Sequence, residues 1–201
     1  MSARKSPNTR RQASHRLRAK ILSRKTVFRG RVFSVTSEHV KEPNGITATR
    51  EVVRHAGSVV VLAVDDTGPE PRVLLEKQYR YAANAYLWEL PAGRIDQGER
   101  PLAAGKRELL EETGYRARNW KQALFFYSSP GFLDETMSVF LARGLTSGKA
   151  RPEEDECIEC NLVPLSCALR MISSGEIRDG KTIASILWYA EYRRRERAIS
   201  F

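Results

Sequence analysis

The chain has 201 residues, 41% of them hydrophobic, and a formal net charge of +10 at neutral pH. This length and composition suffice for one hydrophobic core and predict a single folded domain. The absence of any run of 18 apolar residues argues against a membrane span, and three sparse cysteines argue against a disulfide framework and for a reducing, cytoplasmic location.

Most of the positive charge lies at the start of the chain. Residues 1–25 contain nine Lys or Arg and no Asp or Glu, which leaves 25 basic against 24 acidic residues in the remainder. This composition predicts a basic, flexible arm over residues 1–26 and one domain over residues 27–201. A solvated arm is the preferred interpretation. Contact with nucleic acid or another anionic surface, or a transit peptide, are the alternatives.

The β-prone sequence that follows predicts the first strands. Residues 29–54 contain two such runs around Asn44-Gly45, a strong turn signal, and are expected to form a long N-terminal β-hairpin. Ser58–Val64 is continuously apolar, as expected for a buried strand, and Arg72–Tyr79 is expected to run back beside it.

The segment from residue 93 to residue 115 predicts an unusually acidic helix. Glu108, Glu111 and Glu112 are spaced so that they share one helical face, where like charges cost stability. A hard divalent cation with oxygen ligands would convert that cost into affinity. Arg107, next to Glu108, can pair with a carboxylate and orient it.

The residues around this helix suit its ends. Gly93 and Gly114 bracket it, and Pro101 fits its first turn. In the preceding loop, Leu90-Pro91-Ala92-Gly93, backbone carbonyls can approach whatever the carboxylates hold.

The rest of the chain adds strands and two helices. Two β-prone runs flank a loop at residues 128–135, and a polar loop at residues 146–154 precedes an alternating, half-buried strand. Asp179 is a candidate N-cap for the last helix. The strand-and-helix order predicts an α/β fold of the α+β sandwich kind with mixed strands. The expected elements are strands at Ala123–Tyr127, Thr136–Ala142 and Glu156–Val163, and helices at Ser166–Ser173 and Lys181–Arg194.

The acidic segment resembles the Nudix box, GX5EX7REUXEEXGU, where U is a bulky apolar residue. Every fixed place is filled, by Gly93, Glu99, Arg107, Glu108, Leu109, Glu111, Glu112, Gly114 and Tyr115. The resemblance to Nudix hydrolases implies a mixed β-sheet between helices and a requirement for Mg²⁺, with Mn²⁺ as a possible substitute. It also implies metal ligation by Glu108, Glu111, Glu112 and the Ala92 carbonyl, with Glu99 and Arg107 as accessory and orienting residues.

Three further stretches are similar to the ADP-ribose pyrophosphatase subfamily. They are Gln78-Tyr79-Arg80 followed by Trp88–Gly93, Pro130 placed 15 residues after Tyr115, and the segment Gly175–Thr182. The resemblance implies that metal-activated water hydrolyses ADP-ribose to AMP and ribose 5-phosphate. GDP-mannose or another sugar nucleotide is the alternative substrate. A non-catalytic ligand sensor with a nucleic-acid-binding arm is a third possibility, disfavoured because all box glutamates are present.

The same resemblance implies positions for substrate binding. Arg80 and Arg50 are expected at the pyrophosphate or terminal ribose, because a planar guanidinium binds phosphate oxygens bidentately. For Arg50 a cross-strand ion pair on the hairpin is an equal alternative. Glu135 is expected near the terminal ribose, and Phe28 is a candidate for contact with the base.

The general base and the oligomer are likewise implied by the resemblance. Glu154, with Glu153 as the second choice, is expected to accept the proton of the attacking water, although four consecutive acids also suit a plain solvated loop. The family commonly forms homodimers, which here would use the N-terminal hairpin.

Overall fold

The structure is a computed structural model that describes residues 18–150 and 158–199. The chain groups into two compact units. The first runs to His55 and includes Ser129–Asp134, and the second comprises Ala56–Ser128 and the chain from Glu135 onward. Each unit is described by itself.

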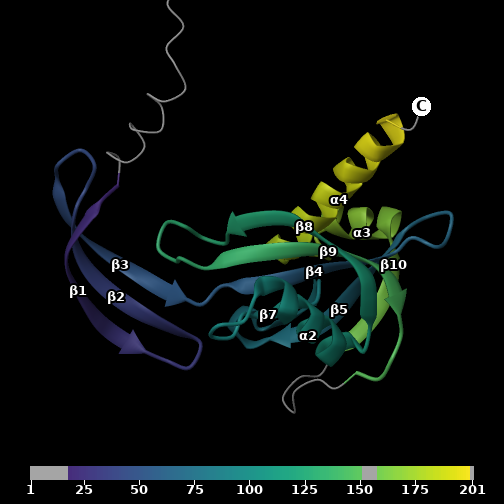
Figure 1. Cartoon of the computed structure of the whole chain (residues 1–201), viewed down its shortest axis with the longest axis horizontal. Helices are drawn as coiled ribbons and strands as arrows, with labels where there is room; N and C mark the ends of the chain where they lie inside the picture. Colours follow the sequence, from purple (N-terminus) through teal and green to yellow (C-terminus); the bar gives the residue numbers. More distant parts are fainter. Residues whose placement is uncertain (1–17, 151–157, 200–201) are drawn as a thin grey trace, which may run out of the picture. The chain divides into compact units, whose positions relative to one another are not determined.

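The first unit is a three-stranded antiparallel sheet (Figure 1) of β1 (Lys20–Arg29), β2 (Phe33–Lys41) and β3 (Thr47–His55). The predicted hairpin is confirmed as β2 and β3. Its turn is closed by a hydrogen bond from Gly45 N–H to the Glu42 carbonyl, 2.9 Å, with Gly45 at φ +88°. That left-handed backbone suits glycine.

Strand β1 corrects one prediction. Residues 20–26 were expected in the flexible arm, but they belong to a strand that pairs with β2 from Lys20 to Arg29. The basic residues around them concealed the apolar Ile21 and Leu22. The charge is partly balanced in the sheet, where Arg24 Nε lies 2.7 Å from Glu38 Oε1. The rest of the arm predicted over residues 1–26, that is residues 1–17, lies outside the described residues.

The second unit is built around β4 (Ser58–Asp65) in a seven-stranded sheet. Strand β4 runs parallel to β9 (Thr136–Thr146) and antiparallel to its other partners. The path is β10-β5-β4-β9-β8, with β6 pairing β5 and β7 pairing β4. The remaining strands are β5 (Arg72–Arg80), β6 (Ala85–Glu89), β7 (Ala92–Arg94), β8 (Arg116–Tyr127) and β10 (Glu159–Pro164), with a 3-10 turn, η1 (Tyr81–Ala83).

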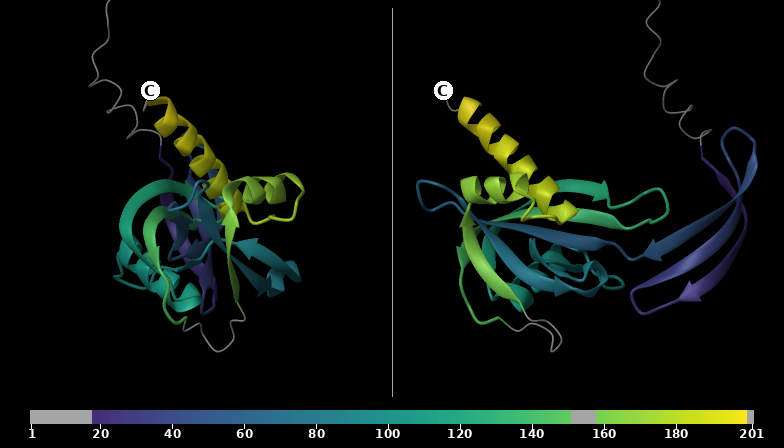
Figure 2. Two further views of the ribbon diagram at one scale, coloured as in Figure 1. Left: turned by 90° about the vertical axis from the view of Figure 1, so that its right-hand side faces the viewer. Right: turned by 180° about the vertical axis from the view of Figure 1, so that it is seen from behind.

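Helices cover both faces of this sheet, as Figures 1 and 2 show. Alternate residues of β4 serve the two faces because side chains along a strand alternate. Val60 and Leu62 belong to the core cluster shared with α3 (Leu165–Ser173) and α4 (Gly180–Ile199). Val61 and Ala63 pack on the side of α2 (Pro101–Thr113). The predicted mixed sheet between helices is therefore confirmed.

The predicted elements are present with shifted ends. Strand β8 begins seven residues before the predicted Ala123, at Arg116, and β9 continues past Ala142 to Thr146. Helices α3 and α4 confirm the two expected late helices. Asp179 caps α4, since its Oδ2 accepts a hydrogen bond from Thr182 N–H at 2.9 Å. No helix in the described ranges is long and apolar enough to cross a bilayer.

Candidate active site

Helix α2 is held close to the centre of the second unit by small residues. Pro101 begins the helix, and Gly114 ends it with φ +74°, as predicted. A Cβ on Gly105 would lie 3.1 Å from Val59 Cγ2 on β4, a contact tighter than usual, so the glycine lets the helix lie close against this strand. The acidic face of α2 is thereby fixed beside the loop that joins β6 to β7.

That loop is anchored at three successive residues. Leu90 N–H donates to Thr182 Oγ1 at 2.8 Å, the Pro91 carbonyl accepts from Val61 N–H at 2.8 Å, and Ala92 N–H donates to Glu112 Oε2 at 3.1 Å. The backbone of Ala92 and the carboxylate of Glu112 are therefore neighbours. The sequence analysis had assigned both to the same metal site.

Gly93 makes the closest approach between loop and helix. A Cβ built on Gly93 would lie 2.6 Å from Glu108 Oε2 and closer still to Oε1. The backbone thus forms a cradle for this carboxylate that any side chain would fill. The glycine of the box is explained by this contact, since no positive φ is recorded for it.

Arg107 joins three of the predicted site residues. Its guanidinium donates to Glu99 Oε2 at 3.0 Å, to Glu108 Oε1 at 2.8 Å and to Glu111 Oε2 at 3.1 Å. The hydrogen bonds to Glu99 raise the pKa of Arg107, although burial opposes this. The same contacts lower the pKa of Glu99. Glu99 is thus held ionised, and the guanidinium of Arg107 brings the three carboxylates together around one cation.

Glu112 is the buried member of the set, with 5% of its surface exposed. Its backbone carbonyl faces Cys160 Sγ at 3.9 Å. Burial raises the pKa of the Cys160 thiol to about 12, and the negative charges of Glu76 and Glu112 contribute. Cys160 is therefore a neutral thiol at neutral pH and no candidate nucleophile.

In residues 18–150 and 158–199, no three His, Cys, Asp or Glu side chains already form a metal-binding group. The residues nevertheless fit a hard divalent cation. Three carboxylates occupy adjacent turns of α2, and the Gly93 cradle brings backbone against one of them. In the structure, the guanidinium of Arg107 provides positive charge beside Glu108 and Glu111 on the acidic face of α2.

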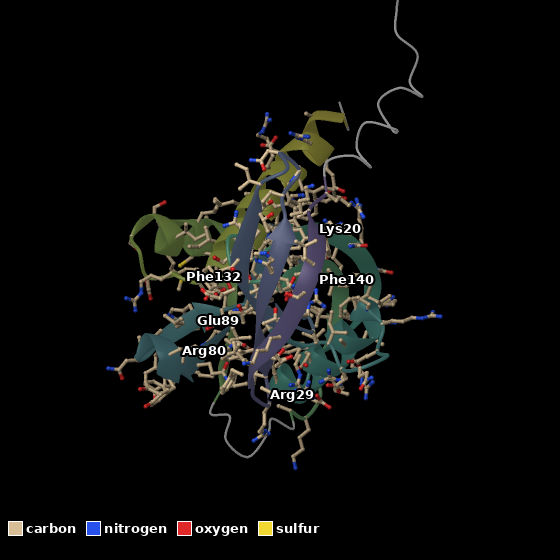
Figure 3. All side chains as sticks on the ribbon, turned by 90° about the vertical axis from the view of Figure 1, so that its left-hand side faces the viewer. Lys20, Arg29, Arg80, Glu89, Phe132 and Phe140 are labelled. Carbon is tan, nitrogen blue, oxygen red and sulfur yellow. The ribbon has the colours of Figure 1, made fainter. Side chains whose placement is uncertain are left out.

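Arg80, a predicted substrate residue, pairs with Glu89 on the neighbouring strand (Figure 3). Its Nε and Nη2 each donate to one carboxylate oxygen at 2.9 Å. Glu89 is 1% exposed and Arg80 38% exposed, so the pair is open on the arginine side. Burial opposes the charge of Glu89, but the bonds from Arg80 and the charge of Lys181 hold the pKa of Glu89 below its ordinary value.

The other predicted substrate residues have local partners. Glu135, in the second unit, accepts hydrogen bonds from Ser58 Oγ at 2.7 Å and Ser128 Oγ at 2.9 Å. In the first unit, Arg50 pairs with Glu42 at 2.7 Å, which is the ion pair on the hairpin that the sequence left as an alternative. Phe28 is half exposed and its ring centroid lies 5.5 Å from that of Phe33.

Glu153 and Glu154 lie outside the described residues. The chain approaches that segment beside the end of α2, because a Cβ on Gly114 would lie 2.5 Å from Ala150 N. It continues in β10, whose Cys160 faces the Glu112 carbonyl. Beside the C-terminal end of α2 is a cavity of about 410 Å³, lined by Leu110, Glu111, Arg116, Gly148 and Lys149.

A slightly larger cavity, about 460 Å³, lies near Pro69, Pro71 and the contact of α3 with α4. Its lining contains none of the predicted site residues. The acidic face of α2, Arg80, Arg107 and the anchored loop all lie away from this cavity. The candidate site is therefore identified by the chemistry of its residues and not by the size of a cavity.

Sequence reasoning missed the residues behind Arg80. Glu89 pairs with Arg80, Lys181 pairs with Glu89, and the fully buried Thr182 accepts a hydrogen bond from Leu90 in the site loop. In the sequence, these three residues stood out only because they lie in the stretches Trp88–Gly93 and Gly175–Thr182, which are similar to the subfamily. That similarity assigned none of the three a role.

Comparison with known proteins agrees with this geometry. Residues 54–185 match the NUDIX domain family. The chain belongs to this family. It is 40% identical over 172 residues to an ADP-ribose pyrophosphatase of Bacillus subtilis, covering 85% of this chain and 91% of that one.

Two further similarities extend this finding. An ADP-ribose pyrophosphatase of Mycobacterium tuberculosis is 39% identical over 170 residues, covering 83% of this Nudix protein and 80% of that chain. A crystal structure of an ADP compounds hydrolase superposes with a TM-score of 0.76 at 22% identity, covering 89% and 96% of the two chains. The latter shows a shared fold. The resemblance predicted from the box residues is confirmed.

Proposed function

We propose that this Nudix protein hydrolyses the pyrophosphate bond of ADP-ribose, giving AMP and ribose 5-phosphate. The observation that carries the chemistry is the contact between the Gly93 backbone and the Glu108 carboxylate at the acidic face of α2. The substrate is supported by the two ADP-ribose pyrophosphatases that are about 40% identical over most of the chain.

We propose that Glu108, Glu111, Glu112 and the Ala92 carbonyl would hold Mg²⁺, with Mn²⁺ as a substitute. Such a cation lowers the pKa of an attacking water and neutralises phosphate charge. Arg107 and Glu99 would orient the Glu108 and Glu111 carboxylates, because Arg107 bonds to all three. Removal of the bound cation would leave Arg107 as their principal counter-charge.

In the proposed reaction, a water oxygen bonds to one phosphorus and the bridging P–O bond breaks. Glu154, with Glu153 as the second candidate, accepts the proton that the water loses, and the leaving phosphate takes the electron pair of the broken bond. Cys160 has no part, because its raised pKa keeps it protonated.

Substrate binding is assigned to Arg80, Arg50, Glu135 and Phe28. Arg80 is the best supported, because Glu89 binds one edge of its fork and its side chain remains partly exposed. A guanidinium in that state can bind phosphate oxygens through its other edge. Arg50 would first have to leave Glu42, an exposed pair of small energetic weight.

We propose a homodimer formed through the first unit. Strand β1 is exposed along its whole length, and the unit presents Ile21, Leu22, Val27, Phe28 and Phe33 to solvent. Apolar surface of this kind favours a protein partner. Light scattering would test it. A cytoplasmic location is proposed from the free thiols Cys160 and Cys167, and a role of the basic arm in nucleic-acid contact is disfavoured.

The deciding experiment is phosphate release, coupled to added phosphatase, over a panel of ADP-ribose, GDP-mannose, ADP-glucose, NADH and dinucleoside polyphosphates with Mg²⁺. A strong preference for ADP-ribose is expected. A preference for GDP-mannose would replace the substrate and keep the chemistry. Binding of ADP-ribose without turnover of any compound would indicate a sensor.

A further inference from the structure

The buried carboxylate of Glu89 is shared by two cations from different elements. Arg80, at the end of β5, donates to both oxygens at 2.9 Å, and Lys181 Nζ, in the first turn of α4, also contacts Oε2. A charge with 1% exposure must be paired to be tolerated. Two cations therefore share the single carboxylate of Glu89, and the negative charges of Glu76 and Glu112 also act on Arg80.

Lys181 is itself held in place. Its Nζ lies 3.1 Å from Asp179 Oδ1, and Asp179 Oδ2 accepts from Thr182 N–H at 2.9 Å and Thr182 Oγ1 at 2.6 Å. Thr182 Oγ1 in turn accepts from Leu90 N–H at 2.8 Å. One chain of polar contacts therefore joins Arg80, the start of α4 and the loop that carries Ala92 and Gly93.

The geometry leaves one edge of the guanidinium available. Nε and Nη2 of Arg80 are bound to Glu89, and no other acceptor of Arg80 is found in residues 18–150 and 158–199. A bidentate pair fixes the plane of the guanidinium, so the direction of Nη1 is fixed as well. Without Lys181, Glu89 would have one less constraint on its orientation, and its charge would act on Arg80 alone.

We propose that Lys181 is a positioning residue for substrate binding, which acts through Glu89 to hold Arg80 in the orientation that binds a diphosphate. This inference rests on the proposed function, because it takes the ligand of Arg80 to be the substrate diphosphate. It gives the segment Gly175–Thr182 a role that its resemblance to the family did not supply.

The test compares Lys181→Met with Arg80→Lys and with the double variant. ADP-ribose binding is measured by calorimetry in EDTA, where no turnover occurs, and KM and kcat are measured with Mg²⁺. Lys181→Met is expected to raise Kd and KM about tenfold, the usual scale for loss of an orienting partner. Its kcat should stay within about twofold, because only binding is affected.

Two comparisons separate positioning from general structural damage. The double variant should bind about as weakly as Arg80→Lys alone, because the effect of Lys181 passes through Arg80. Lys77→Met is the matched control. Lys77 lies on the same strand three residues from Arg80, but its ammonium faces the Trp88 ring at 5.5 Å, so its Kd should equal that of the wild type.

Wild-type binding by Lys181→Met, or additive losses in the double variant, would overturn the inference. If Lys181→Met does not fold, Lys181→Gln keeps a donor to Glu89 without the charge. It is expected to weaken binding, and wild-type binding by it would equally overturn the inference. Failure of the proposed function would look different, since the wild type would then bind none of the diphosphates on the panel.

Discussion

The backbone of Gly93 and the carboxylate of Glu108 lie so close together that no side chain fits between them. The atom that a substitution would displace is the end of a flexible glutamate and not part of the main chain. A side chain at residue 93 should therefore leave the fold intact but force the Glu108 carboxylate out of its present position.

Gly93→Ala is accordingly expected to reduce kcat/KM by about 10- to 100-fold, the scale for displacing a ligand from its orienting contacts. The displaced Glu108 would lose its hydrogen bond with Arg107. Thermal unfolding should change little. Gly68→Ala, in the β4–β5 turn, is the control because a Cβ there meets nothing closer than 3.8 Å. Equal activity in both variants would contradict the assignment.

Glu112→Gln tests the metal assignment directly. The amide oxygen of glutamine can still accept the hydrogen bond from Ala92 N–H, so the loop should stay in place while the charge is lost. Phosphate release is expected to fall by about 100-fold, with an unchanged circular dichroism spectrum. Glu191→Gln, which removes an exposed charge on α4, should have no effect. Near-normal turnover by Glu112→Gln would exclude a ligand role.

Glu154→Gln tests the general base. It is expected to lower kcat much more than it weakens binding, by about 100-fold, since general base catalysis contributes on that scale. Glu153→Gln provides the comparison and should retain most of its kcat. If the two effects are exchanged, Glu153 is the base. If only KM changes, the acidic loop binds substrate and moves no proton.

Arg107→Ala removes the cation shared by Glu99, Glu108 and Glu111. The remaining like charges should lower the midpoint of thermal unfolding in EDTA by about 2–4 °C per kcal/mol lost. Added Mg²⁺ should raise the midpoint more in the variant than in the wild type, because the metal takes over the neutralisation. Equal rises in the two proteins would show that Arg107 and the cation do not serve the same carboxylates.

Glu38 gives a prediction on pH. Burial opposes its charge, but hydrogen bonds from Arg54 and Arg24 lower its pKa from 4.5 to about 2. Because the folded pKa is below the unfolded one, the stabilisation is present above about pH 4.5 and is lost as the pH falls toward 2. Chemical denaturation at several pH values should therefore find Glu38→Gln less stable at pH 6, with the difference from wild type shrinking on acidification.

Much of the fold and the acidic helix could be predicted because they are local in the sequence. The spacing of Glu108, Glu111 and Glu112, the residues Pro101 and Gly114 at the two ends of α2 and the Asn44-Gly45 turn all act over a few residues. Gly93, which was expected to bracket the helix, lies in β7. Strand β1 was missed for the opposite reason. Its charged residues suggest a solvated arm, and only pairing with β2, where Glu38 faces Arg24, makes a strand of them.

The residues that support the site were missed because their contacts are distant in sequence. Thr182 meets Leu90, and Lys181 meets Glu89, across the whole of the intervening chain. No periodicity or spacing connects a threonine near one helix start with a loop amide on another element. The contact partners of Arg80 likewise required coordinates, since its sequence context indicated only a binding role.

The central position of β4 also has a consequence for biosynthesis. Residue 58 pairs with residue 137, and the parallel ladder continues to residues 64 and 143. When β4 leaves the ribosome, its parallel partner has not yet been translated, so one edge of a strand that is apolar from Val59 to Val64 stays unpaired until β9 is made. Long-range pairing of this kind slows folding. The nascent chain is therefore expected to need protection from aggregation until β9 has emerged.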